Sequence, residues 1–333
     1  MPVSELEPTL ADVLRARQLV RAHLPRTPLH RYPGLETLIG TPTWVKHENH
    51  HAVGAFKVRG GVTLAAGLGE AERRAGLYTA STGNHGQSIA FAGQTSGAAV
   101  TIAVPEGANP TKVEAMRSLG AEVLFQGADY DEAREWVRGQ AEEKGGRFIG
   151  PTDPELIAGV GTFALEILED LPEVDVILVP VGAGSGACGV CLVAKTLRPG
   201  VRVIGVQSEA APAMVHAWRG TPLVDARSDT VAEGLATRVP FENTQRIMRH
   251  PELGLDDFVL VSDAELEEAI RLLLRHTRNV AEHAGAAALA AALRLRHTLR
   301  GLRVVLVLSG GNLDPSELKR ILGSQAFPTH SVL

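Results

Sequence analysis

Short apolar runs separated by helical segments constrain the fold of this chain more than any other feature. Three of these runs are VDVILVPV at 174–181, VRVIGV at 201–206 and LRVVLVL at 302–308. None of them alternates apolar and polar side chains, so each is expected to be buried on both faces, as strands of a parallel sheet are. Repeated strand–helix units join parallel strands by right-handed crossovers. The sequence therefore predicts an α/β protein built on doubly wound parallel sheets.

The expected elements alternate along most of the 333 residues. We predict strands at 43–47, 77–80, 100–104, 122–125, 176–181, 202–207 and 303–308. We predict helices at 9–24, 58–75, 130–144, 155–170, 186–197, 263–278 and 284–299, and two more that begin near His85 and Thr111. Pro151–Pro154 interrupts the alternation, which places a candidate domain boundary near Gly145–Thr152.

Composition and charge exclude several classes of protein. The formal net charge is −5, and Lys and Arg are dispersed among acidic residues, so the chain lacks the basic surface that nucleic acids require. No apolar run is long enough to cross a bilayer. Residues 1–17 lack the charged-then-apolar pattern of a signal peptide, and two cysteines do not make a disulfide framework. We therefore expect a cytoplasmic protein without nucleic-acid or membrane partners.

Three loops of unusual chemistry follow predicted strands, at the edge where open parallel sheets bind ligands. The loop STGNHGQ at 81–87 offers hydroxyls, an amide and backbone N–H groups just before a helix, which favours an anion such as a carboxylate. The loop GAGSG at 182–186 is small enough to close around a phosphate. The loop LSGGN at 308–312 offers a hydroxyl to a flat heterocycle. Each loop taken alone could also be an ordinary turn or a capped helix start.

A lysine in the stretch KHENHHAVGAFKVRGG, residues 46–61, completes this set. Lys57 follows Phe56 and a glycine-containing turn, and it precedes an apolar helical pattern. A lysine, a phosphate cradle, a carboxylate-binding loop and a hydroxyl for a ring nitrogen together suit one cofactor. That cofactor is pyridoxal phosphate, which forms a Schiff base with lysine.

Three other motifs suggest different chemistry on a weaker basis. The sequence HENHH at 47–51 matches the H-E-x-x-H zinc motif, but that motif needs a helix and here a strand precedes it. Gly182, Gly184 and Ala187 match the dinucleotide fingerprint of a nicotinamide oxidoreductase, but Glu209 lies somewhat late for the acidic residue that the fingerprint needs. The C-x-x-C at 188–191 falls inside an apolar helix, so we expect buried core thiols.

The sequence resembles the fold-type II pyridoxal-phosphate enzymes, specifically the threonine dehydratase and serine racemase group. Residues 46–61 are similar to that group's lysine signature, STGNHGQ to its substrate loop, GAGSG to its phosphate loop and LSGGN to its pyridine-nitrogen loop. The resemblance implies two doubly wound parallel-sheet domains, similar to tryptophan synthase β. Residues 1–76 and 148–333 would form a large PLP-binding domain, and 77–147 a small substrate-side domain. Because the chain ends soon after LSGGN, we expect no C-terminal regulatory domain of the kind some threonine dehydratases carry.

The resemblance also implies roles for individual residues. Lys57 would hold the cofactor and act as the base at the substrate Cα, and Thr82 would be the second catalytic group. The other cofactor-binding residues would be Phe56, Asn84, Gly182, Ala183, Gly184, Ser185, Gly234, Glu282 and Ser309. The substrate would be bound by Ser81, Thr82, Gly83, His85 and Arg134. Glu209 and Ala213 would supply two ligands of a Mg²⁺ site, although Val215 stands where the group has an aspartate.

The implied activity is β-elimination from a β-hydroxy amino acid. L-threonine would give 2-oxobutyrate and ammonia, and L-serine would give pyruvate and ammonia. A serine racemase is an alternative, because the group uses a serine hydroxyl at the position of Thr82. A β-hydroxyaspartate-type dehydratase uses the same motifs and is another. Outside this chemistry remain an NAD-dependent oxidoreductase and a catalytically silent cofactor-binding protein. The resemblance alone leads us to expect a homodimer.

Overall fold

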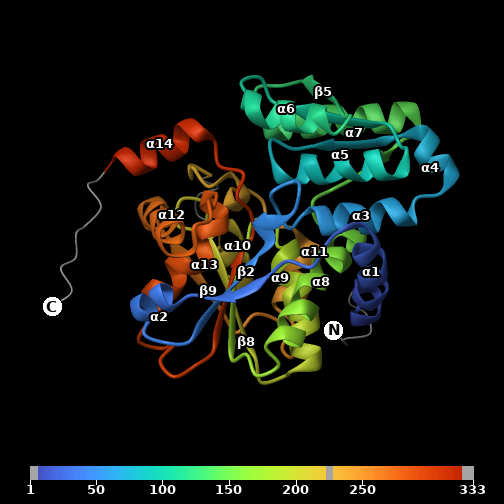
Figure 1. The fold of residues 1–333 in the computed structure, drawn as a ribbon. Coiled ribbons are helices and arrows are strands. Elements are labelled where there is room, and N and C mark those ends of the chain that lie inside the picture. Colours follow the sequence, from blue (N-terminus) through green and yellow to red (C-terminus); the bar gives the residue numbers. More distant parts are fainter. Residues whose placement is uncertain (1–6, 223–227, 325–333) are drawn as a thin grey trace.

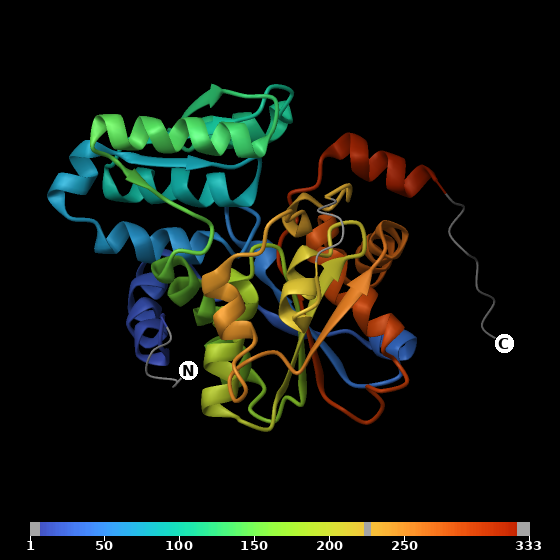
Figure 2. The same cartoon turned by 180° about the vertical axis from the view of Figure 1, so that it is seen from behind.

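Two sheets organise the computed structural model, which describes residues 7–222 and 228–324 (Figure 1). The larger sheet has six strands in the order β1-β2-β10-β7-β8-β9, and the smaller has four in the order β5-β4-β3-β6. Figures 1 and 2 show the smaller sheet and its helices as a separate lobe beside the larger one. The predicted α/β class, with two doubly wound parallel-sheet domains, is confirmed.

The larger sheet is buried on both faces, as its apolar runs predict. Its strands are β1 (Leu29–Arg31), β2 (Thr43–His47), β7 (Val176–Pro180), β8 (Arg202–Ser208), β9 (Asp257–Val261) and β10 (Val304–Leu308). β1 runs antiparallel to β2 at one edge, and all other neighbours are parallel. Along β7, Ile177 and Val179 join one hydrophobic cluster while Val176 and Leu178 join the other. Alternate side chains of one strand therefore fill two separate cores.

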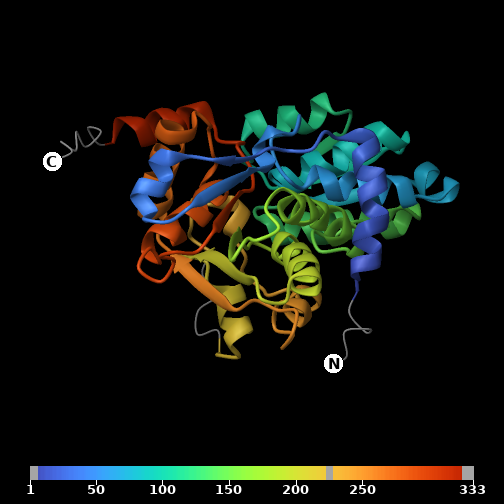
Figure 3. The same ribbon diagram turned by 60° about the horizontal axis from the view of Figure 1, so that its bottom comes forward.

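Helices cover both faces of the larger sheet. One face packs against α1 (Leu10–His23), α8 (Pro154–Asp170), α9 (Ser185–Leu197), α10 (Ala213–Arg219) and α11 (Glu242–Met248), with α1 lying along α8 (Figure 3). The other face packs against α2 (Pro33–Ile39), α12 (Asp263–Thr277), α13 (His283–Arg294) and α14 (Pro315–Gly323). The described residues also form the 3-10 helices η2 (Glu48–His50) and η3 (Glu233–Leu235). None of the helices in the described ranges is both long and apolar enough to span a membrane.

The smaller sheet is entirely parallel. Its strands are β3 (Leu77–Ala80), β4 (Val100–Val104), β5 (Glu122–Phe125) and β6 (Arg147–Phe148). α3 (Val58–Gly67), α5 (Asn84–Ser96) and α6 (Pro110–Ser118) cover one face, and α7 (Tyr130–Lys144) covers the other. The sheet with α5, α6 and α7 is called the smaller lobe below.

Two predicted helices differ from the observed ones. The helix expected at 58–75 is two helices, α3 and α4 (Glu70–Ala75). Leu68 has an extended backbone and buries its side chain in the smaller core, and the Glu72 carboxylate then accepts the N–H of Gly69 at 2.9 Å to start α4. The helix expected at 284–299 ends at Arg294.

Three helices meet through backbone contacts at glycines. A Cβ on Gly159 of α8 would lie 2.4 Å from the carbonyl oxygen of Arg59 in α3. A Cβ on Gly189 of α9 would lie 2.7 Å from the Cα of Gly161 in α8. Only glycine permits such close approach. α8 thus touches both α3, which follows Lys57, and α9, which follows the loop GAGSG.

A buried ionic network also ties α8 to the start of α3. Arg59 donates to Glu48 through Nε and Nη2 at 2.7 and 2.9 Å, and to Glu166 through Nη1 and Nη2, both at 2.9 Å. Lys46 Nζ donates to Glu166 Oε2 at 2.6 Å. Lys46, Glu48 and Arg59 are completely buried. Two positive and two negative charges therefore balance beneath the segment that holds Lys57.

Candidate active site

A cavity of about 770 Å³ lies between the two lobes, at the carboxyl ends of β3, β7 and β10. Its lining includes the lysine segment and residues from all three loops that the sequence analysis singled out. The predicted site residues found in its wall are Phe56, Lys57, Ser81, Thr82, Gly83, Asn84, His85, Arg134, Gly182, Ala183, Gly184, Ser185, Gly234, Glu282 and Ser309. Segments far apart in the sequence therefore face one space.

Lys57 occupies the N-cap position of α3 and belongs to the wall of this cavity. Its Nζ donates a hydrogen bond to the Ser185 hydroxyl at 2.9 Å and lies 5.4 Å from the centre of the Phe56 ring. Desolvation lowers the pKa of Lys57 to about 8. More of this amine is neutral near pH 7 than in an exposed lysine, and the neutral amine is the form that attacks a carbonyl group.

The loop at 182–185 forms a cradle of backbone N–H groups in front of α9. Gly184 is the N-cap of α9, with a left-handed backbone at φ 100°. The next three N–H groups, at 185–187, have no acceptor within the helix and lie at the positive end of its dipole, whereas the N–H of Cys188 donates to the Gly184 carbonyl oxygen. A Cβ on Gly182 would lie 2.1 Å from the carbonyl oxygen of Gly234, so this loop must be glycine there. Such a cradle suits a phosphate group.

The loop after β3 leads into the N-terminus of α5. Gly83 is the N-cap, and its N–H donates to Ser81 Oγ at 3.2 Å. His85 Nε2 lies 3.0 Å from Thr79 Oγ1. Burial and the Lys57 charge lower the pKa of His85 to about 3, so this imidazole is neutral near pH 7. An anion here would be bound by hydroxyls and helix-terminal N–H groups rather than by a charged histidine.

Hydrogen bonds join the two lobes at the cavity. Asn84 Nδ2 donates to Glu282 Oε1 at 2.6 Å, and Asn312 Nδ2 donates to Asn84 Oδ1 at 2.8 Å. Burial raises the pKa of Glu282. Ser309 directly follows β10, is 5% exposed, and its carbonyl accepts the N–H of Phe56 at 3.0 Å. The start of α5, the start of α13 and the loop after β10 are thereby held together.

A family model described as "Pyridoxal-phosphate dependent enzyme" matches residues 20–310. The chain belongs to this family. It is 38% identical over 316 residues to the L-threonine ammonia-lyase of Thermotoga maritima, covering 94% of this chain and 78% of that protein.

Solved structures of this pyridoxal-phosphate family superpose closely on the chain. Threonine deaminase isoform 2 from Solanum lycopersicum, in its processed form, gives a TM-score of 0.87 at 29% identity, over 96% of this chain and 94% of that one. A pyridoxal 5'-phosphate-dependent aspartate racemase gives 0.88 at 30% identity, over 96% and 99%. The resemblance to fold-type II enzymes is therefore confirmed, and pyridoxal phosphate is the cofactor of this family. The donor set of the cavity, an amine 2.9 Å from a hydroxyl at the N–H cradle, suits that cofactor.

The two predicted Mg²⁺ ligands lie outside the cavity of this pyridoxal-phosphate enzyme. Glu209 Oε1 accepts hydrogen bonds from Nη1 and Nη2 of Arg294, both at 3.1 Å. This carboxylate is therefore paired with Arg294 in the structure. Ala213 is buried at the start of α10. The structure thus adds no support for a magnesium ion at this place.

The zinc and thiol motifs have structural roles in this enzyme. η2 follows β2 directly, so His47 and His51 do not share the face of an α-helix, and the Glu48 carboxylate is taken by Arg59. Cys188 and Cys191 are completely buried, and burial raises the pKa of both thiols. The loop that matches the dinucleotide fingerprint faces Lys57.

The cavity also contains residues that the sequence analysis did not assign to the site. Lys112 of α6 and Glu233 of η3 form an ion pair at 2.6 Å between the lobes. Asn312 belongs to the loop LSGGN, and its position in that motif could have indicated it. Tyr130 lies one turn from Arg134 on α7, in the same wall. Lys112 and Glu233 are 121 residues apart, and no spacing in the sequence shows that they meet.

Proposed function

We propose that this enzyme catalyses pyridoxal-phosphate-dependent β-elimination, converting L-threonine to 2-oxobutyrate and ammonia and L-serine to pyruvate and ammonia. The observation that carries the proposal is the Lys57 amine, 2.9 Å from Ser185 at the N–H cradle and in the same cavity as the loop at 81–85. The activity named for the Thermotoga maritima relative supports the substrate class.

Each part of the cavity wall has a task in this reaction. Bound pyridoxal phosphate would supply an electron sink that acidifies the substrate Cα proton. The N–H groups at 182–185 would hold its phosphate, and the Ser309 hydroxyl would meet its ring nitrogen. Lys57 Nζ would accept the Cα proton. A hydroxyl does not hold the ring nitrogen protonated as a carboxylate would, which suits elimination better than transamination.

The substrate would be oriented from the smaller lobe. The hydroxyls of Ser81 and Thr82 and the free N–H groups at the start of α5 would bind its carboxylate. Asn84 would contact the cofactor, with its amide held by Glu282 and Asn312. Phe56 would pack near the ring.

A second candidate is a racemase or a dehydratase of β-hydroxyaspartate type. Thr82 offers a hydroxyl that could return a proton to the face opposite Lys57. Arg134 of α7 lies in the cavity wall and could pair with a side-chain carboxylate. The similarity to an aspartate racemase supports keeping this candidate.

Product analysis tests these proposals. The cofactor-loaded enzyme is incubated with L-threonine, L-serine or L-β-hydroxyaspartate, and 2-oxo acid, ammonia and D-amino acid are measured. We expect 2-oxobutyrate and pyruvate as the main products, and Lys57→Ala should lose both them and the visible absorbance of the bound cofactor. If D-serine is the main product from L-serine, the enzyme is a racemase and the proposed β-elimination is wrong. A cofactor-loaded enzyme that releases neither 2-oxo acid nor D-amino acid would refute both.

Further proposals concern organisation and location. We propose a large domain of residues 1–76 and 148–333 and a small one of 77–147, although 1–6, 223–227 and 325–333 lie outside the described residues. Membership of two separate sheets supports this division, apart from Phe148, which pairs with the smaller sheet. We also propose that the protein is cytoplasmic and that it forms a homodimer. Size-exclusion chromatography with light scattering tests the homodimer. The Mg²⁺ pair Glu209 and Ala213 stays a prediction, tested by activity with a chelator and with added magnesium chloride.

A further inference from the structure

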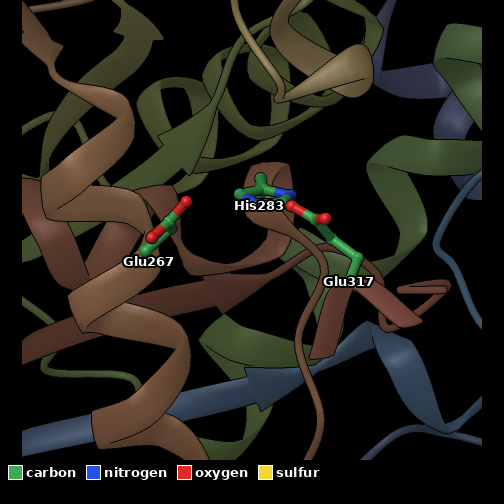
Figure 4. Close-up of side chains that lie close together, drawn as sticks. All are labelled: Glu267, His283 and Glu317. Carbon is green, nitrogen blue, oxygen red and sulfur yellow. Dashed lines mark ion pairs between the residues drawn. The ribbon is translucent and has the colours of Figure 1, made fainter. Parts of the chain in front are cut away.

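A second cluster of ligand-type side chains lies where three helices of the larger lobe meet. Glu267 of α12, His283 of α13 and Glu317 of α14 each bring one ligand atom within 4.8 Å of the others (Figure 4). Within residues 7–222 and 228–324, no other group of three or more His, Cys, Asp or Glu side chains converges in this way.

His283 makes this cluster more than a pair of acidic residues. The residue is 5% exposed, and its Nε2 has no hydrogen-bond partner among the described residues. That nitrogen faces Glu317 Oε1 at 3.7 Å, which is too long for a hydrogen bond. Burial lowers the pKa of His283, so the ring is neutral near pH 7. A buried nitrogen left beside a carboxylate in this way costs stability, and a cation between the two would remove that cost.

We propose that Glu267, His283 and Glu317 form a binding site for a divalent transition-metal ion, with Zn²⁺ as the best match. One imidazole and two carboxylates are ligands that zinc accepts, whereas magnesium and calcium prefer oxygen ligands alone. Bonds of about 2.0–2.2 Å would place tetrahedral ligand atoms roughly 3.4 Å apart, leaving the fourth position to water. His283 and Glu317 already approach this separation at 3.7 Å, and the Glu267 ligand atom lies within 4.8 Å of both.

Arg320 competes with the metal ion for the same carboxylates. Its Nη2 donates to Glu267 Oε1 and to Glu317 Oε1, both at 2.5 Å. The Arg320 side chain is 48% exposed, so its guanidinium can turn into solvent when a metal ion binds. The metal ion must therefore displace the Arg320 guanidinium from both carboxylates, and removing this guanidinium should strengthen metal binding.

The proposed metal site adjoins the cofactor cavity. His283 follows Glu282, and both His283 and Glu317 belong to the cavity wall. A bound ion would join α14, which follows the loop at 309–314, to α12 and α13. It would fix one rim of the cavity whatever reaction takes place inside.

Calorimetric titration with zinc chloride tests the proposal on chelator-treated, cofactor-loaded protein. We expect one Zn²⁺ per chain and a rise in the thermal unfolding midpoint. Glu267→Gln and His283→Gln should each weaken binding at least about tenfold, and Arg320→Gln should tighten it. Glu268→Gln is the matched control, because Glu268 is the next residue of α12 and pairs with Arg271 instead, at 2.8 Å. This variant should bind zinc as the unchanged protein does.

Two results would overturn the assignment. The first is equal zinc affinity in Glu267→Gln and the unchanged protein, which would mean that others of the 12 histidines hold the ion. The second is no measurable binding to either the unchanged protein or Arg320→Gln. If His283→Gln fails to fold, Glu267→Gln alone decides, because Glu267 lies outside the cofactor cavity.

Discussion

Replacement of Glu166 by glutamine should destabilise the protein strongly, because it removes one of two negative charges from the buried network around Arg59. Glu166 is 5% exposed and accepts hydrogen bonds from Arg59 at 2.9 Å and Lys46 at 2.6 Å. In the variant, the completely buried Lys46 ammonium keeps the carbonyl of Thr27, at 2.7 Å, but loses its closest opposite charge. The network then carries two positive charges and one negative.

The expected magnitude follows from this burial. Breaking a buried ion pair by removing one partner costs about 3–5 kcal/mol, because an uncompensated charge stays in the interior. An exposed pair contributes only about 0–1 kcal/mol. For a chain of this size, the loss expected for the buried pair lowers the thermal unfolding midpoint by an amount on the order of 10 °C.

Glu169→Gln is the matched control for this experiment. Glu169 lies one turn further along α8 and contacts Arg17, Arg21 and Arg26, but its side chain is 32% exposed. Thermal and urea unfolding of both variants, followed by circular dichroism, gives the two free energies. Glu166→Gln should lose several times as much stability as Glu169→Gln. Equal losses would refute the reasoning that burial makes the network's charge balance important.

Four further predictions follow from the site and the network. The rate at which the cofactor-free protein takes up pyridoxal phosphate, followed by absorbance, should rise with pH toward about 8 and level off above it, because Lys57 must be neutral; a flat profile would contradict this pKa. Gly184→Ala should weaken cofactor binding, measured by fluorescence titration, by about 1–3 kcal/mol, because φ is 100° and the new Cβ would lie 2.9 Å from Thr244 Cβ; unchanged affinity would argue against a cradle at this loop. Thr82→Ser keeps the hydroxyl and removes a methyl group, so the ratio of D-serine to pyruvate formed from L-serine should increase, and an unchanged ratio would deny Thr82 a part in protonation. Burial acts to raise the pKa of Glu166, but the hydrogen bonds and charge of Arg59 outweigh burial and hold this pKa below the usual 4.5. The Glu166 carboxylate therefore contributes its full stabilisation above pH 4.5 and loses it as the pH falls further. Acidification should accordingly reduce the free energy of unfolding less in Glu166→Gln than in the unchanged protein.

The sequence predicted those parts of the fold that depend on local pattern. β7 and β10 were predicted because strands buried on both faces are apolar without interruption. β9, DFVLV, was not predicted although four of its residues are apolar; it lies at the sheet edge with Val259 and Leu260 partly exposed. The seven-residue helices α2, α10 and α11 are too short to show a helical period, and β1 and β6 have only three and two residues.

In the candidate site too, features encoded by a local sequence pattern were predicted and features that depend on tertiary contacts were not. The loops around Asn84, Gly184 and Ser309 were predicted because glycines and hydroxyls at strand ends have few structural reasons to gather there. The pairing of Lys112 with Glu233 was not, because it depends on how the two lobes face each other. The cluster at His283 depends on the crossing of three helices, and no local pattern in the sequence encodes such a crossing.

The backbone contacts between α3, α8 and α9 limit how this enzyme can change. The spacing between Lys57 and the phosphate cradle depends on helices whose backbones touch at Gly159 and Gly189. In an ordinary core, the spacing between two helices can change by one methylene group at a time through substitution of the side chains between them. At Gly159 and Gly189, any added side-chain carbon would force the helices apart. The wall formed by α7 does not take part in these glycine contacts, so its side chains, such as Arg134, can be replaced without moving α3, α8 or α9. Substitutions on α7 can therefore change what the cavity accepts while the spacing between Lys57 and the phosphate cradle stays the same.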